Sequence, residues 1–182
     1  MRLLFGTVVS VLLAVVAAPG CGSGSPTSPT PQTTNPCVPQ TAQCLLDAAS
    51  ISVTVNNVGV DIGSTATAAV GTAVNLKVDY MNMSGQTAWT GVLYVRDDGR
   101  ERFSGCFGSG AGGSLSFGGF ASPFTISAND LVFTSGHTAK VLVVAAFRPF
   151  AIGSPCPLRT SAGEFDHTVV EGQRHVVTVA VQ

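Results

Sequence analysis

Apolar and polar residues alternate with a period of two over much of the chain after residue 50, and this pattern constrains the fold most strongly. Successive side chains of a strand point to opposite faces, so such alternation predicts strands with one buried face. It is clearest in residues 51–55, 74–80, 89–95, 141–147 and 175–181. In 141–147 the second face is apolar as well, which predicts a central strand.

Turn residues separate these segments. Asp98-Gly99 is a strong hairpin signal, because Asp-Gly accepts the positive φ angles of a two-residue turn. Ser84-Gly85, Ser135-Gly136 and Glu171-Gly172 mark further turns. Only residues 43–49 have a brief helical pattern. Short strands with frequent turns predict an all-β fold, a two-sheet sandwich, over residues 45–182.

Charge is scarce in this chain. Hydrophobic residues make up 45% and charged residues 10%, whereas about a quarter is usual for charged residues. Lys and Arg number 9 and Asp and Glu 10, which gives a net charge of −1. A protein that neutralises several phosphates needs a basic excess, so we expect no nucleic-acid partner.

The long apolar run, residues 3–18, lies at the N-terminus behind Met1-Arg2. As a helix it would span roughly 24 Å, short of the roughly 30 Å hydrocarbon core of a bilayer. A cleaved secretory signal peptide over residues 1–20 therefore fits better than a transmembrane anchor.

Small residues lead from this run directly to a cysteine, in Ala17-Ala18-Pro19-Gly20-Cys21. The stretch resembles the lipobox of bacterial lipoproteins, in which the Cys after the cut receives diacylglycerol. The resemblance implies lipid attachment at Cys21 and an anchor of several acyl chains, which together bind a membrane stably. Because no Asp follows Cys21, it also implies the outer membrane in a host that has one. Secretion without a lipid is the alternative.

The segment that follows is uncharged from Gly22 to Gln43, and five of the ten prolines lie between Pro26 and Pro39. Such a composition buries too little apolar surface to offset its ordering entropy. Proline also favours extended geometry. We therefore expect residues 21–44 to be a disordered tether that holds the domain away from a membrane.

The five cysteines are an odd number for an exported protein: Cys21, Cys37, Cys44, Cys106 and Cys156. With Cys21 carrying lipid, four remain, and three pairings are open. We favour a short Cys37–Cys44 loop and a long Cys106–Cys156 bridge, worth about 2 and 4 kcal/mol on the chain-entropy model. Without a C-x-x-C motif, and with histidines not spaced as zinc ligands, we expect no metal and no cofactor.

A second resemblance lies in the predicted strands. Residues 69–78, Asn82, Ser84-Gly85, residues 92–95 and Asp98-Gly99 resemble bacterial immunoglobulin-like domains, most closely the cell-adhesion-related type. The resemblance spans residues 51–147; the Cys106/Cys156 pair and residues 152–182 depart from it. It implies an immunoglobulin-like sandwich with a non-catalytic binding or scaffolding role, and it carries over no functional residue.

Two motifs have simpler interpretations than their chemical ones. Residues 108–113 match G-x-G-x-x-G, but residues 114–119 are typical of a strand, whereas dinucleotide binding needs a helix there. We expect an inter-strand loop.

Residues 96–102 form the only dense charge cluster. A Ca²⁺ site needs six or more oxygen ligands, so we expect a solvated hairpin tip.

Histidines and aromatic residues are the other candidates. His137, His167 and His175 would have to meet Asp130, Glu164 or Asp166 to form a catalytic site, and no H-E-x-x-H or G-x-S-x-G motif is present. A sugar-stacking platform would need Trp89, Tyr80 and Tyr94 together. Trp89 and Tyr94 alternate onto opposite faces, and a lone Trp more often fills a core.

The sequence thus predicts a lipid-anchored, non-catalytic envelope protein that presents an immunoglobulin-like binding or adhesion module to a protein or glycan. Two alternatives remain open. One is a structural accessory subunit of an envelope complex. The other is an exported hydrolase with an unrecognised site.

Overall fold

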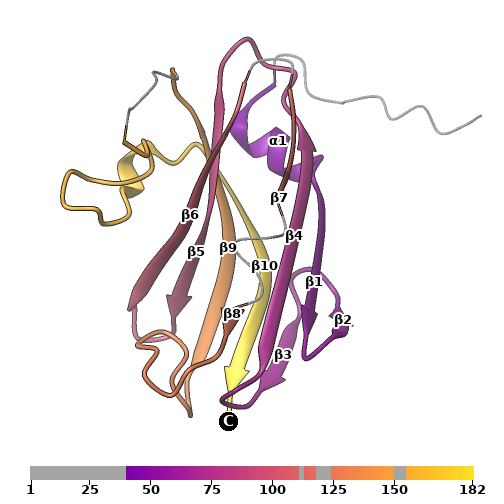
Figure 1. Ribbon diagram of the computed structural model, residues 1–182, viewed down its shortest axis with the longest axis vertical. Coiled ribbons are helices and arrows are strands. Elements are labelled where there is room, and N and C mark those ends of the chain that lie inside the picture. The colour runs from indigo at the N-terminus through magenta and orange to yellow at the C-terminus, as the bar shows by residue number, and fades with distance from the viewer. Residues whose placement is uncertain (1–39, 111–112, 118–123, 150–154) are drawn as a thin grey trace, which may run out of the picture. The chain divides into compact units, whose positions relative to one another are not determined.

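The computed structural model describes residues 40–110, 113–117, 124–149 and 155–182 (Figure 1). The predicted signal peptide, Cys21, Cys37 and most of the predicted tether lie outside these residues. Within the described part of the chain, no helix has the length and apolar character needed to cross a bilayer.

Two sheets pack against each other, so the predicted all-β sandwich is confirmed. The first sheet has the order β2-β1-β4-β7, with β8 also paired to β4. Its strands are β1 (Ser50–Val55), β2 (Val58–Val60), β4 (Ala73–Met81), β7 (Ser114–Phe117) and β8 (Phe124–Thr125). The second sheet has the order β3-β10-β9-β5-β6. Its strands are β3 (Thr65–Ala68), β5 (Ala88–Arg96), β6 (Glu101–Ser109), β9 (Thr138–Phe147) and β10 (Gly172–Val181).

The five segments with period-two patterns all fall in strands of this sandwich. The segment that is apolar on both faces becomes β9, which lies between β10 and β5 in the middle of the second sheet. β3 is parallel to β10, and the other pairs are antiparallel. The alternation therefore predicted both the strands and the central place of β9.

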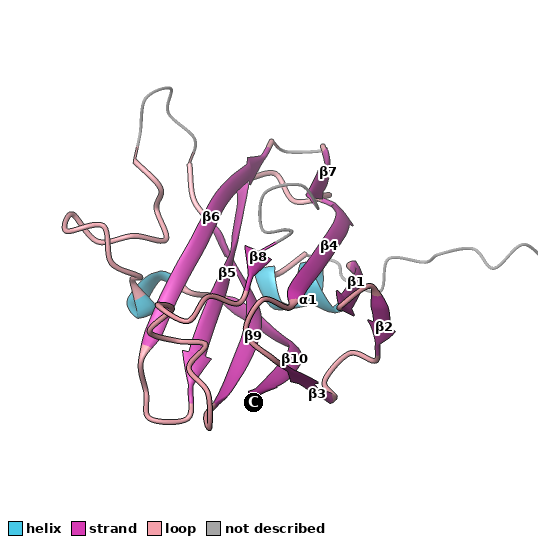
Figure 2. Cartoon of the chain, turned by 60° about the horizontal axis from the view of Figure 1, so that its bottom comes forward, coloured by secondary structure: helices cyan, strands magenta, loops and turns pink. Residues whose placement is uncertain are grey.

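The main core lies between the two sheets. It is built largely from valines of β1, β4, β9 and β10, with Tyr80 and Tyr94 among them. The short helix α1 (Ala42–Asp47) closes one end of the sandwich between the sheets (Figure 2). Its Leu45 and Leu46 are buried in the same core, and Arg174 of β10 donates to the carbonyl of Leu46 at 2.7 Å.

The domain begins before residue 45, where the sequence placed its start. The Gln40 side-chain oxygen accepts from the backbone amides of Met83 at 2.7 Å and Ser84 at 3.0 Å, in the turn after β4. Thr41 caps α1 by accepting from the amide of Cys44. Residues 40–44 are uncharged, like the tether before them. These hydrogen bonds and the burial of Ala42 in the core attach them to the domain.

The sequence predicted a turn at Glu171-Gly172, and this prediction is wrong, because β10 begins at Gly172. A Cβ at Gly172 would overlap the backbone of Ala42 and Gln43 in α1. Glycine is required there because the helix approaches the strand closely, and not because the chain reverses direction.

The outer face of the second sheet carries a further layer. Residues 155–171, here called the covering segment, include the short 3₁₀ helix η1 (His167–Val169) and pack over β5, β6 and β9. Beneath this layer lies a second apolar cluster that contains Trp89, Leu93 and Val144, with Leu158 of the covering segment. Trp89 is buried as expected, but it lies in this cluster and not between the sheets.

A disulfide joins the covering segment to the sheet. Cys106 of β6 and Cys156 are bonded, with their Cα atoms 5.9 Å apart. Cys44 is disulfide-bonded as well, and its predicted partner Cys37 lies outside the described residues, so that pairing stays a prediction. The long bridge holds an additional layer on the sandwich, in the part of the chain that departs from the immunoglobulin-like pattern.

Candidate functional site

The two ends of the sandwich differ in what they carry. The chain enters at Gln40, beside the turn that joins β4 to β5. β5 runs from this end to Arg96, so the hairpin between β5 and β6 lies at the opposite end, together with the connection from Ser127 to Gly136 (Figure 1). The end opposite the chain entry is here called the distal end.

The hairpin at the distal end differs in length from the sequence expectation. The amide of Arg96 donates to the carbonyl of Arg100 at 2.8 Å, and the amide of Gly99 donates back to the carbonyl of Arg96 at 2.9 Å. Gly99 has a φ of 86°. This is a three-residue loop whose last residue is left-handed, the common alternative to the predicted two-residue turn.

Residues 96–102 were expected to be solvated, but not all of their charged side chains face solvent. Arg96 is only 5% exposed; its guanidinium pairs with Asp98 and donates to the Thr134 hydroxyl at 3.0 Å. The hydrogen bond from Arg96 holds the pKa of Asp98 well below its ordinary value. The expectation is wrong for Arg96 because a long side chain can fold back and satisfy its donors within the protein.

Asp97 ties the hairpin to β9. Its carboxylate accepts from the amide of Thr138 at 2.9 Å and lies 2.7 Å from Nδ1 of His137. These bonds, first the amide and then the imidazole, lower the pKa of Asp97. His137 therefore contributes to the fastening of a loop at the distal end.

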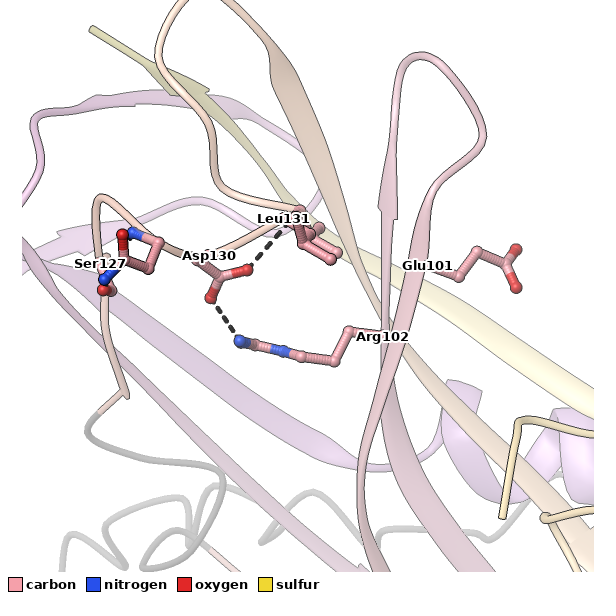
Figure 3. Close-up of a pocket in the computed structure, with 7 residues that line it drawn as sticks. Glu101, Arg102, Ser127, Asp130 and Leu131 are labelled. Atoms are coloured by element: carbon pink, nitrogen blue, oxygen red, sulfur yellow. Dashed lines mark hydrogen bonds and ion pairs between the residues drawn. The ribbon is translucent and has the colours of Figure 1, made fainter. Parts of the chain in front are cut away.

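A cleft of about 440 Å³ lies beside the hairpin, and its floor is an ion pair between Arg102 and Asp130. Figure 3 shows Arg102 pointing across the cleft to Asp130, while Glu101, its neighbour in β6, points the other way. The Asp130 side chain is 7% exposed, and its Oδ1 accepts from the amide of Val132 at 3.0 Å. Leu131 is 69% exposed at the rim.

Aromatic rings support this ion pair from below. The Arg102 guanidinium lies 4.8 Å from the ring centre of Tyr94, 5.6 Å from that of Phe133 and 5.8 Å from that of Phe124. A cation is attracted to the faces of such rings. Burial raises the pKa of Tyr94 to about 12, so its phenol stays neutral. The cleft thus places an ion pair, held over aromatic rings, beside the exposed side chain of Leu131.

No local pattern links Arg102 to Asp130, because the pair is separated by 28 positions in the chain. From the sequence, Asp130 was one of three acids that could have paired with a histidine in a catalytic site. The structure shows instead that it accepts from the loop amides at residues 132 and 133 and from Arg102.

The three histidines considered for a catalytic site contact different partners, and Glu164 lines a pocket together with His167. His167 pairs with Glu101 at 2.7 Å, and His175 lies 3.0 Å from the Thr178 hydroxyl. Asp166 caps η1 by accepting from the hydroxyl and the amide of Thr168, and these hydrogen bonds lower the pKa of Asp166. These contacts fasten the covering segment and β10.

The three aromatic residues of the hypothetical sugar platform are divided between the two cores. Tyr80 and Tyr94 lie between the sheets, and the Tyr80 hydroxyl is 3.1 Å from that of Thr90. Trp89 lies under the covering segment, where its indole N–H donates to the carbonyl of Arg148 at 3.2 Å. Their side chains do not share an exposed face.

The glycine-rich motif joins two strands. β6 ends at Ser109 and β7 begins at Ser114, so a strand follows where dinucleotide binding needs a helix. Fully buried Asn82 lies against this connection: its side-chain amide donates to the carbonyls of Ser109 at 3.1 Å and Gly110 at 3.2 Å. The described part of the motif is thus held by a side-chain amide at the end where the chain enters.

Among the described residues, no three His, Cys, Asp or Glu side chains gather as metal ligands would. No family model matches the chain, and no curated protein matches it above chance.

Proposed function

We propose that this chain is an exported envelope protein, anchored to a membrane by lipid on Cys21, that presents an immunoglobulin-like domain as a non-catalytic binding module. The observation that carries the proposal is the order of its parts: an apolar run, Cys21 after small residues, an uncharged proline-rich segment, and then a β-sandwich. An anchored domain needs such a spacer to clear the lipid headgroups, and the composition of the spacer favours an extended chain.

The entry point of the chain supports the choice of binding surface. Since the chain reaches the domain at Gln40, the distal end is the end of the sandwich opposite this entry point. The cleft of Arg102 and Asp130 lies there, beside exposed Leu131. Its ion pair, in which the Asp130 carboxylate is buried, holds the shape of the surface, and a preorganised surface loses less entropy when a partner binds.

The anchor is tested by Cys21→Ser in the full chain, expressed in a bacterium that lipidates its own lipoproteins and labelled with a fatty acid. We expect the label to be lost and the protein to leave the membrane fraction. The matched control is Cys37→Ser, the same chemical change in the same segment, which should keep both. Membrane retention of the Cys21→Ser protein, or loss of label in the control, would refute the anchor.

The binding surface needs its own experiment. A photo-crosslinking residue placed at Leu131 of the full chain should give a discrete cross-linked product in intact cells. The same residue placed at Ser52, which is exposed on the outer face of β1, should give none. Equal labelling from both positions, or none from Leu131, would remove the distal end as the binding surface. Digestion of the domain by protease added to intact cells would separate a surface module from a periplasmic accessory subunit.

A further inference from the structure

A second cavity, of about 390 Å³, lies between β6 and the covering segment. Its volume falls within the range of small-molecule sites, roughly 300 to 1,000 Å³. Figure 3 shows that Glu101 of β6 points away from the cleft of Arg102 and Asp130. Glu101 lines this second cavity, together with six other residues that include two aromatic rings and three further ionisable side chains.

The wall contributed by the covering segment is a small hairpin. The amide of Thr160 donates to the carbonyl of Glu164 at 2.8 Å, and the amide of Gly163 donates to the carbonyl of Thr160 at 2.9 Å. The Phe165 ring stacks on Phe103 of β6, with the ring centres 4.9 Å apart. These contacts hold the walls before any ligand arrives, which reduces the entropy lost on binding.

Arg159 brings a positive charge to this cavity. Its guanidinium lies 4.8 Å from the ring centre of Phe103 and donates to the carbonyls of Gly163 at 2.6 Å and Phe103 at 3.2 Å. Both acceptors are neutral, and no carboxylate of the described residues forms an ion pair with Arg159. A guanidinium has five N–H donors in a fork that matches a carboxylate, so Arg159 keeps three of them for a ligand.

Glu164 brings a negative charge to the same cavity. Its side chain is exposed, and in the part of the chain that the structure describes its carboxylate has neither a hydrogen bond nor an ion pair. The other acid, Glu101, already pairs with His167 at 2.7 Å. Arg159 and Glu164 thus line one cavity without pairing with each other, and each is left uncompensated.

This arrangement discriminates between classes of ligand. A ligand with only negative charge would be attracted to Arg159 but repelled by Glu164, and a ligand with only positive charge would meet the reverse. A zwitterion satisfies both side chains. The stacked rings of Phe103 and Phe165 add an apolar wall against which a hydrocarbon group can be buried.

We propose that this cavity binds a free α-amino acid with an apolar side chain, with its carboxylate on Arg159 and its ammonium group on Glu164. In a longer peptide the two charged termini lie at opposite ends of the chain, so a single amino acid is the ligand that carries both into one small cavity. The site is distinct from the distal end, and it requires no lipid on Cys21.

The site is tested by equilibrium dialysis of radiolabelled L-leucine against the full chain in non-ionic detergent. We expect saturable binding of one molecule per chain. In competition, N-acetyl-L-leucine, which lacks the ammonium group, and L-leucinamide, which lacks the carboxylate, should each bind at least about tenfold more weakly. No saturable binding of L-leucine up to about 10 mM would overturn the proposal. An analogue that binds as tightly as L-leucine would do the same, because it would show a site for a single charge.

Glu164→Gln locates the bound amino acid. It removes the anion but not the hairpin, since Glu164 is held there through its backbone carbonyl. The variant should bind L-leucine at least about tenfold more weakly and should bind N-acetyl-L-leucine no more weakly than the wild type does. The matched control is Asp61→Asn, which removes an exposed carboxylate between β2 and β3 and should change neither affinity.

Both variants should keep the circular dichroism and thermal midpoint of the wild type. Equal weakening of L-leucine binding by Glu164→Gln and Asp61→Asn would mean that net charge governs the affinity. Wild-type affinity in the Glu164→Gln protein would place the amino acid elsewhere on the chain. Either result would overturn the proposal.

Discussion

The outer faces of the two sheets are built from the same kind of strand and meet opposite surroundings. On the first sheet the outward side chains of β1 and β4 are mostly polar: Lys77 pairs with Asp79 at 2.9 Å, and Asn75 donates to Thr54 at 3.1 Å. On the second sheet the outward side chains of β5 include Trp89 and Leu93, both buried. One face meets solvent, whereas the other supports a third layer.

Because of this difference, the domain has a second apolar cluster, outside the second sheet, in addition to the core between the sheets. A face that keeps large apolar side chains must be covered, and the covering segment does so with Leu158, which is fully buried. The segment has little regular structure of its own, so its position depends on the disulfide, the Phe103–Phe165 stack and the ion pairs of Glu101 and Arg148. The stability of this layer should therefore depend on a few identifiable contacts.

The largest effect is expected from removing the disulfide, in the double variant Cys106→Ala/Cys156→Ala. The bridge spans a sequence separation of 50 residues, for which the chain-entropy model gives about 4 kcal/mol of unfolding free energy. Denaturant unfolding measures the loss. Amide hydrogen exchange should accelerate in residues 156–171 and stay slow in β1 and β4. Equal acceleration in both sheets would show that the covering segment is not a separate layer.

Leu158→Ala should destabilise the protein by about 3 kcal/mol, because it opens a cavity in the apolar cluster outside the second sheet. The chain has one Trp and two Tyr, and they report on different cores: Trp89 on the outer cluster, and Tyr80 and Tyr94 on the space between the sheets. Trp89 fluorescence should shift to longer wavelength in the folded variant. Leu76→Ala, a cavity between the sheets, is the matched control and should leave that emission unchanged.

The polar face could be predicted from the sequence, and the covered face only in part. Asn75, Lys77 and Asp79 alternate with Leu76 and Val78, so the orientation of β4 follows from period two alone. The double-sided apolar pattern of residues 141–147 likewise predicted a central strand. These signals are local, since each depends on neighbouring residues of one strand.

What the sequence did not indicate depends on residues far apart in the chain. Trp89 donates to Arg148, 59 positions away, and Arg102 pairs with Asp130 across 28. The cleft and the covering segment are made of such pairs, and composition gives no sign of them. A bulge between His175 and Val177 also places both Val176 and Val177 in the core, which strict alternation does not allow.

A smaller effect is expected from alkaline pH, and it tests the core between the sheets. Burial raises the pKa of Tyr94 from 10.0 to about 12, so above pH 10 the unfolded chain loses a proton that the folded chain keeps. Stability should fall as pH rises from about 10 to 12, by roughly 2 kcal/mol from this group. Tyrosinate absorbance should appear together with unfolding; titration of both tyrosines in the folded protein would contradict their burial. Tyr94→Phe should reduce the slope.

The smallest effect should come from the ion pair on the polar face. The Lys77 side chain is 60% exposed, and exposed pairs contribute at most about 1 kcal/mol. Lys77→Ala should therefore change the unfolding free energy by no more than about 0.5 kcal/mol. Its counterpart is Arg148→Ala on the covered face, since Arg148 pairs with Glu171 and donates to the Val169 carbonyl at 3.1 Å. The second loss should be clearly larger, because it also releases a carbonyl of the covering segment. Equal losses would mean that the third layer depends on apolar contact and the disulfide alone.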